Sequence, residues 1–169
     1  MQISKAELDD VPRLEKLINS AYRGESSKKG WTTEADFLEG IRTDEDSLVE
    51  MINNPHAVIL KYCDDENNLQ GCVYLEKKKD QMYLGMLTVS PMQQAKGIGK
   101  ILLAASEKFA LDENCYEMGM TVISIRDELI GWYEKHGYSK TGDKRPFPSD
   151  IKFGIPKIPL EFVVMKKKL

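Results

Sequence analysis

The first half of the chain alternates between helical and strand-like patterns of apolar residues. Over residues 7–21 the apolar positions recur every three or four residues, which predicts an amphipathic helix after a short first strand at 1–6. Cap-like and acidic residues from Thr32 predict that a second helical region begins there and continues to Asn54, with a break near Thr43. Short apolar runs bounded by polar turns then predict three antiparallel strands, at 57–63, 69–77 and 83–89.

The second half continues this alternation. Apolar residues from Ile98 onward recur at helical spacing and predict a helix that ends near Asn114. A strand at 117–123 should follow, and then a helix capped by Ser124 or Asp127.

Proline disrupts the pattern near the C-terminus. A strand is expected to begin at 138–141, after Gly137 has ended the preceding helix. The segment 142–159 contains four prolines and is expected to form a long irregular connection. A last strand at 160–165 and a solvated lysine tail complete the prediction.

The loop before Ile98 is rich in glycine and lysine. Glycines at the start of a helix allow a turn in which backbone N–H groups converge, and these groups have no intrahelical partner. Such a place suits a phosphate or pyrophosphate. A Walker A loop is excluded by Gln94 and Ile101, and Leu102 stands where a dinucleotide fingerprint needs its third glycine. The candidate phosphate-binding residues are those of the loop: Gln94, Ala95, Lys96, Gly97, Ile98, Gly99 and Lys100.

Two motifs together resemble the signatures of the GNAT acetyltransferases. Gln94, Gly97 and Gly99, directly after a strand that ends in valine, are similar to the family's acyl-CoA loop. A Gly-x-Gly alone also fits a simple tight turn, but 130–138, which reads Ile-Gly-Trp-Tyr-Glu-Lys-His-Gly-Tyr, resembles the second signature. The resemblance implies one α/β (α+β) domain over 1–169, with a central, mixed, mostly antiparallel sheet of about seven strands and about four flanking helices.

This resemblance also implies a reaction. GNAT enzymes transfer an acetyl group from acetyl-CoA to a primary amine by direct attack in a ternary complex. The loop would hold the pyrophosphate of the cofactor, and the strand end at Leu87, Thr88 and Val89 would pair with its pantetheine arm. Tyr133 occupies the position of the tyrosine that protonates the departing thiolate. Arg126 stands where the family often has an asparagine, and no role is carried onto it.

The general base and the acceptor site are assigned from the positions of single residues along the chain. The strand before the loop has no carboxylate, so Glu76 on the preceding strand is the preferred base, with Glu117 as the alternative. Two segments are expected to wall the acceptor site, and they contribute Tyr22, Trp31, Arg145 and Phe147. The missing carboxylate also keeps open a different class of function, an acyl-CoA-binding sensor or interaction module that performs no transfer.

Composition narrows the class of protein. The chain has 169 residues, 41% hydrophobic and 30% charged, and a net charge of −3 argues against a nucleic-acid partner. The apolar runs are too short to span a membrane, and no signal peptide is recognisable, so a cytoplasmic location is expected. The three cysteines lack metal-ligand spacing, so no metal is expected. Dimers are frequent in the family, which makes a homodimer an expectation only.

Overall fold

The computed structural model describes residues 2–169 and contains a seven-stranded sheet in the order β1–β3–β4–β5–β6–β9–β7. The mixed, mostly antiparallel sheet predicted from the sequence is therefore confirmed: β5 and β6 pair in parallel and every other neighbouring pair is antiparallel. In sheet order the strands are β1 (Gln2–Lys5), β3 (Ala57–Cys63), β4 (Leu69–Lys78), β5 (Gln81–Val89), β6 (Glu117–Ile123), β9 (Glu161–Lys168) and β7 (Ser139–Pro146).

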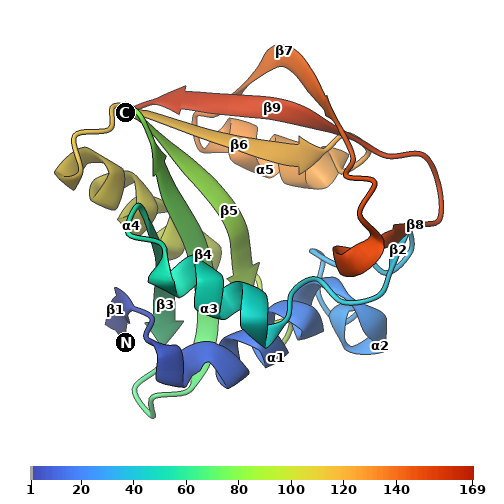
Figure 1. Cartoon of the computed structure of the whole chain (residues 1–169), viewed down its shortest axis with the longest axis horizontal. Coiled ribbons are helices and arrows are strands. Elements are labelled where there is room, and N and C mark those ends of the chain that lie inside the picture. Colours follow the sequence, from blue (N-terminus) through green and yellow to red (C-terminus); the bar gives the residue numbers. More distant parts are fainter. Residues whose placement is uncertain (1) are drawn as a thin grey trace.

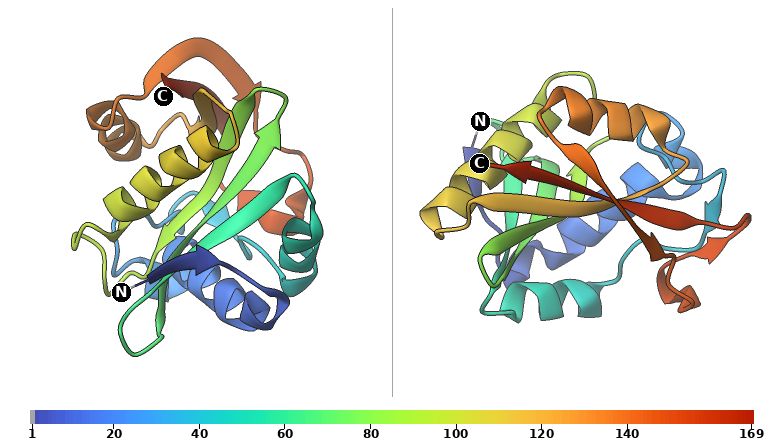
Figure 2. Two further views of the ribbon diagram at one scale, coloured as in Figure 1. Left: turned by 90° about the vertical axis from the view of Figure 1, so that its left-hand side faces the viewer. Right: turned by 90° about the horizontal axis from the view of Figure 1, so that it is seen from above.

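Helices cover both faces of the sheet (Figure 2). One face packs against α1 (Val11–Tyr22) and α3 (Glu45–Asn53), and the other against α4 (Ile98–Asp112) and α5 (Asp127–Lys135). The short elements are η1 (Leu8–Asp10), α2 (Gly24–Ser27), η2 (Ile151–Phe153) and a small second sheet of β2 (Leu38–Glu39) with β8 (Ile155–Pro156).

Each face has its own apolar core, as the periodicity predicts. Leu14 and Ile18, four residues apart on α1, are fully buried on the first face together with Leu48 of α3. Leu102 of α4 is fully buried on the other face and packs in the same cluster as Met118 of β6. Burial of these faces supplies most of the stability of the fold.

The sheet opens between its two parallel strands. β5 and β6 pair only at Gln81–Glu117, Met82–Met118 and Tyr83–Gly119, although both strands continue further. Beyond Tyr83 the two strands diverge, so that the sheet has the outline of a wedge (Figure 1). One edge of β5 is therefore left without a strand partner for the rest of its length.

A bulge in β5 accompanies this divergence. In its pairing with β4, Thr88 lies opposite Cys72 and Gly85 lies opposite Tyr74, so β5 contains one extra residue. Met86, inside the bulge, has a φ of +49°, in the left-handed region. The sequence suggested a distortion near Gly85, and the structure places it one residue further along.

Four local predictions were wrong. Residues 142–159, expected to form an irregular connection, contain the end of β7, the short helix η2 and the strand β8. Residues 32–37 form turns instead of a helix, because the side chain of Glu34 is buried in an ion pair with Arg23. The lysines at 166–168 belong to β9, where Lys166 and Lys167 pair with Glu117 and Glu107, so they are not a solvated tail. Neither predicted residue caps α5; its N-cap is Arg126, without a side-chain cap bond.

Candidate active site

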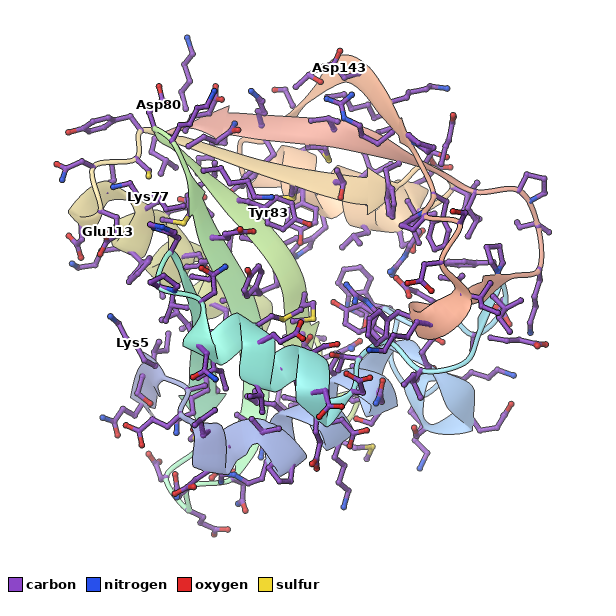
Figure 3. All side chains as sticks on the ribbon, viewed as in Figure 1. Lys5, Lys77, Asp80, Tyr83, Glu113 and Asp143 are labelled. Atoms are coloured by element: carbon purple, nitrogen blue, oxygen red, sulfur yellow. The ribbon has the colours of Figure 1, made fainter. Side chains whose placement is uncertain are left out.

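The wedge between β5 and β6 contains a cavity of about 350 Å³. Its walls come from both diverging strands, from the end of α1 and from α5, and the segment after β7 supplies Phe147 and Phe153 as part of its lining. Tyr83, the last β5 residue still paired to β6, also lines it (Figure 3). The cavity is mostly apolar in its residue types, with a few charged groups, as is typical of small-molecule sites.

A second cavity, of about 510 Å³, lies elsewhere and has a different character. It is lined by Lys5, Lys77 and Glu113 among others (Figure 3). Lys77 Nζ donates a hydrogen bond to the backbone carbonyl of Glu113 at 2.6 Å. None of the residues predicted from the sequence to form a functional site lines this second cavity. The cavity in the wedge is therefore the candidate active site.

Tyr133 reaches this cavity from α5. Its ring is only 5% exposed and packs edge-on against Trp132, at 5.0 Å between centroids, and against Tyr138, at 5.7 Å. Its hydroxyl makes no hydrogen bond within residues 2–169. Burial raises the pKa of the phenol above its ordinary value, and the nearby Tyr22 adds to this effect. A buried, protonated phenol in an apolar cavity can donate a proton to an anion that forms there.

Tyr22 lines the opposite wall and fixes the bulged strand. Its hydroxyl donates a hydrogen bond of 2.5 Å to the backbone carbonyl of Leu87, which also lines the cavity. Burial raises the pKa of Tyr22 to about 12, so the phenol stays protonated and keeps this bond. The bond occupies an acceptor of β5 next to Met86 and holds the free edge of the strand in place.

The glycine-rich loop follows the C-terminal end of β5 and does not contribute to the cavity lining. Ala95 and Gly97 both have left-handed backbones, with φ values of +67° and +82°. Gly97 is the N-cap of α4 and has no side chain to cap it, so the first-turn N–H groups of Ile98, Gly99 and Lys100 are available to an anion. Lys96, also in this loop, donates a hydrogen bond from its Nζ to Oε1 of Gln93 at 2.8 Å.

The side chain of Gln94, the first residue of the motif, forms hydrogen bonds within the protein. Gln94 Oε1 accepts a hydrogen bond of 2.8 Å from the backbone N–H of Trp31, and its Nε2 donates to Thr32 Oγ1 at 2.8 Å and to the carbonyl of Val89 at 3.2 Å. A Cβ at Gly30 would lie 2.6 Å from Oε1, so a larger residue there would displace the amide of Gln94. Gln94 thus connects the loop to the segment after α2.

Of the other predicted cofactor residues on β5, Thr88 is almost fully buried. Its hydroxyl donates to the carbonyl of Met86 at 2.9 Å, which supports the bulge. Val89 lies at the start of the loop, and its side chain approaches Gly99.

The structure brings only some of the predicted acceptor residues together. Phe147 and Tyr22 both line the cavity, and Phe147 stacks on Phe162 at 5.3 Å between ring centroids. Trp31 is 41% exposed and does not line it, and Arg145 on β7 is exposed and bonds the neighbouring backbone. The functional roles assigned to all four residues stay predictions.

Glu76 also lies outside the cavity lining. It is the cross-strand partner of Tyr83, so both side chains project from the same face of the sheet. Its carboxylate forms an ion pair with Lys78 at 3.3 Å. Glu117, the alternative base, is paired with Lys166 at 2.8 Å and accepts from Gln81 at 2.6 Å.

A buried cluster of charges lies in one wall of the cavity, and sequence reasoning missed it. Arg23 donates to Glu34 Oε2 from Nε and Nη2, at 3.2 and 3.1 Å, and from Nη1 to the carbonyls of Ile41 and Phe153, at 2.9 Å each. Glu34 Oε1 lies 3.6 Å from Nη1 of Arg126. The signal that could have indicated this cluster is Arg126 itself, which departs from the family pattern directly before the second motif.

The cysteines and the other acidic and His side chains of the described residues do not indicate a further reactive or metal-binding site. Cys63, Cys72 and Cys115 are buried free thiols, and burial raises the pKa of Cys72 to about 12, so it is no ready nucleophile. Residues 2–169 contain no group of acidic, His and Cys side chains placed to bind a metal ion. In the same residues no helix combines the length and apolar character that crossing a bilayer requires.

Comparison with known structures supports the fold. The chain is similar to the ribosomal-protein-S18-alanine N-acetyltransferase of Escherichia coli, with a TM-score of 0.74 and 14% identity over 99% of this chain and 92% of that one. It is also similar to the PaiA N-acetyltransferase of Thermoplasma acidophilum, solved with coenzyme A, with a TM-score of 0.71 and 19% identity over 99% and 98% of the two chains.

Sequence comparison identifies the family. A curated acetyltransferase of Agrobacterium fabrum is 27% identical over 85 residues, which span 50% of this chain and 61% of that protein. The model of the acetyltransferase (GNAT) family matches residues 12–138, which include the glycine-rich loop and Tyr133. The chain therefore belongs to the GNAT family of acetyltransferases.

Proposed function

We propose that this protein transfers an acetyl group from acetyl-CoA to a primary amine by direct attack within a ternary complex. The observation that carries the proposal is that the free edge of β5 and Tyr133 line one cavity, while the uncapped start of α4 lies next to both of their elements, with Gly99 beside Val89 of β5 and Trp132 of α5. Membership of the family and the similarity to a protein solved with coenzyme A support it.

The residues of the chain suit the proposed cofactor. The loop from Gln94 to Lys100 would hold the pyrophosphate through backbone N–H groups at the start of α4. The edge of β5 at Leu87, Thr88 and Val89, which β6 leaves unpaired, would take the amides of the pantetheine arm as an added strand. Acetyl-CoA supplies the activated acetyl thioester, and these groups would align it with the cavity.

The proposed transfer forms a bond between the amine nitrogen and the acetyl carbon and breaks the bond between that carbon and sulfur. The nitrogen loses one proton and the sulfur gains one, so a neutral amine gives an amide and a free thiol. Tyr133 would donate the proton to sulfur from inside the cavity. A thiolate buried there is itself desolvated, which raises the pKa of the thiol and helps to match it to that of the phenol.

The amine must enter the cavity neutral, because a protonated amine has no lone pair for attack. Glu76 would accept this proton through a water, since it lies beside Tyr83 on the same face of the sheet. If the pH–rate profile of Glu76→Gln lacks the titration of a carboxylate that the wild type shows, this role is supported. An unchanged pH–rate profile in that variant would contradict it.

One observation favours the alternative of acyl-CoA binding without transfer. The carboxylates that line the cavity are Glu34 and Asp150, and Glu34 is engaged by arginine on both of its oxygens. No lining carboxylate other than Asp150 is thus free to remove a proton from an amine.

Calorimetry with acetyl-CoA, followed by thiol release across a panel of amines, distinguishes the two functions. Dephospho-CoA and NADH serve as ligand controls. Binding of acetyl-CoA together with thiol release for some amine would support the transferase, and binding without release for any amine would support a sensor. Failure of acetyl-CoA to bind would refute both functions.

A further inference from the structure

The charges that line the cavity do not balance. Three arginines line it, Arg23, Arg42 and Arg126, against the two carboxylates of Glu34 and Asp150. Deep in the cluster the imbalance is sharper, because Arg23 and Arg126 are both buried and share Glu34 as their buried counter-ion. A guanidinium cannot lose its proton in a protein, so an excess positive charge is held in this wall.

The two buried arginines are not equivalent. Arg23 uses all three of its nitrogens, two of them on Glu34 and the third on the two backbone carbonyls already described. It therefore connects the end of α1 to the segment that contains η2, and these bonds use four of its five N–H groups. Its role is structural.

Arg126 is the arginine with free donors. Its side chain is only 3% exposed, and within residues 2–169 its Nε and Nη2 have no hydrogen-bond partner. Nη1 lies 3.6 Å from Glu34 Oε1, beyond hydrogen-bond distance, and Nε lies 3.5 Å from an oxygen of Glu128, whose side chain is 56% exposed. An orphaned buried donor costs free energy, and a charged one costs more.

The geometry of these donors identifies the kind of anion. Nε and Nη2 lie on one edge of the guanidinium, and their two N–H groups form the planar fork that binds both oxygens of a carboxylate. A carboxylate carries one negative charge, which matches the net charge of +1 given by the three arginines and two carboxylates that line the cavity. A phosphate, with nearly two charges, would overshoot it. The aromatic side chains of Phe147 and Phe153 line the same cavity and suit a small organic ligand.

The same helix places the free fork and the predicted acid on one face. Arg126 precedes Tyr133 by seven residues, almost two full turns, so both side chains project into the cavity. The axial separation of the two backbone positions is about 10 Å, and the long arginine side chain can shorten the distance between functional groups. One small molecule can therefore contact both.

From these observations we infer that the acceptor is an amine that also carries a free carboxylate, such as an amino acid or a short peptide, and that Arg126 binds this carboxylate. The inference rests on the proposed transferase function. Arg126 acts as a specificity-determining residue: it orients the acceptor by its carboxylate so that the amine faces the thioester near Tyr133.

The test compares matched pairs of acceptors that differ only in the carboxylate. Thiol release is measured for alanine and alaninamide, lysine and lysinamide, and a dialanine peptide and its amide, with saturating acetyl-CoA. We expect kcat/KM for the preferred acid to exceed that for its amide by about 30-fold or more, since the amide cannot accept two charge-assisted bonds from the fork. The free amino acids and the peptides tell the two sources of the carboxylate apart.

A variant assigns the preference to this side chain. In Arg126→Gln the ratio of kcat/KM for the acid to kcat/KM for its amide should fall to about one. Arg13→Gln is the matched control: Arg13 and Lys61 both pair with the buried Asp10, as Arg126 and Arg23 both face Glu34, but Arg13 lies away from the cavity. The control should keep the full preference for the acid.

Binding provides a second readout that does not need turnover. With coenzyme A present, the preferred acid should raise the melting temperature of the wild type, and its amide should not. Equal shifts or equal rates for acid and amide would overturn the inference and leave the transferase intact. An acid preference that persists in Arg126→Gln would also overturn it. So would a result in which no acid of the panel binds and none reacts. Failure of the transferase itself would appear differently, as the absence of thiol release from all amines, including amines without a carboxylate.

Discussion

Replacement of Tyr133 by phenylalanine separates the chemistry of the cavity from its packing. The substitution removes only the hydroxyl, which makes no hydrogen bond within residues 2–169, and it leaves the ring contacts with Trp132 and Tyr138 in place. The unfolding free energy should therefore change by less than about 0.5 kcal/mol. If the hydroxyl protonates the departing sulfur, kcat should fall by about 10²- to 10⁴-fold, or about 3–5 kcal/mol in the barrier.

The pH dependence follows from the same burial. Because burial raises the pKa of Tyr133 above its ordinary value of 10.0, the phenol remains protonated throughout the range in which the protein would be assayed. Ionisation of Tyr133 should therefore not lower the wild-type kcat at any pH up to about 9.5. Any fall in kcat at alkaline pH should be the same in the wild type and in Tyr133→Phe. An alkaline limb that this substitution abolishes would mean that the phenol ionises more easily than its surroundings indicate.

Tyr138→Phe is the matched control. Tyr138 is buried on the same aromatic cluster, but its hydroxyl bonds Glu107 at 3.1 Å and lies outside the cavity lining. This variant should lose about 1 kcal/mol of stability and keep its kcat. The assay is thiol release at saturating acetyl-CoA, with affinity for acetyl-CoA measured separately by calorimetry. A Tyr133→Phe enzyme with kcat within about threefold of wild type would refute the role of the phenol as the acid.

Three further predictions concern stability and the cofactor loop. Arg23→Met should lower the unfolding free energy by about 3–5 kcal/mol and the melting temperature by about 6–20 °C, because it leaves Glu34 in the wall with one distant partner; a fall of under about 2 °C would contradict the burial of this pair. Gly97→Ala should weaken acetyl-CoA binding by about tenfold, since alanine is strained by about 1–2 kcal/mol at a φ of +82°, whereas Gly131→Ala inside α5 should bind normally and be slightly more stable. Burial alone would raise the pKa of Asp10, but hydrogen bonds from Lys61, Glu7 and Arg13 outweigh it and lower the pKa to about 2. Asp10→Asn should therefore lower the unfolding free energy by about 1–2 kcal/mol above pH 4, as measured in denaturant titrations. The difference in unfolding free energy between variant and wild type should close as the pH falls from 4 to 2.

The part of the candidate site whose local structure was predictable from the sequence is the part that short stretches of the chain determine. The loop from Gln94 to Lys100 is one continuous turn, so its glycines and its position between a strand and a helix are visible in a few residues. Tyr133 is likewise fixed by its position in α5. Most strands were placed correctly for the same reason, since a short apolar run bounded by turns defines a strand from its own residues.

The other part of the candidate site could not be predicted, because long-range contacts create it. Glu34 looks like a first-turn residue of a helix when it is read beside its neighbours, and that reading produced the false helix from Thr32. Its actual conformation depends on Arg23, eleven residues earlier, and on Arg126 in a distant part of the chain. Periodicity contains no information about which charged residues will be buried together.

This difference in origin has a consequence for how the two ends of the site can change. The proposed cofactor end is held by backbone: the bulge at Met86, the left-handed Gly97 and the uncapped start of α4. A side-chain substitution can alter these features only by disturbing the chain path. The proposed acceptor end is held by side chains, and exchange of Arg126 alone would change the charge of its wall while Arg23 kept Glu34 paired and the fold intact. If the proposed function is correct, family membership constrains the donor much more tightly than the acceptor, and the acceptor has to be inferred from the charges of this particular cavity.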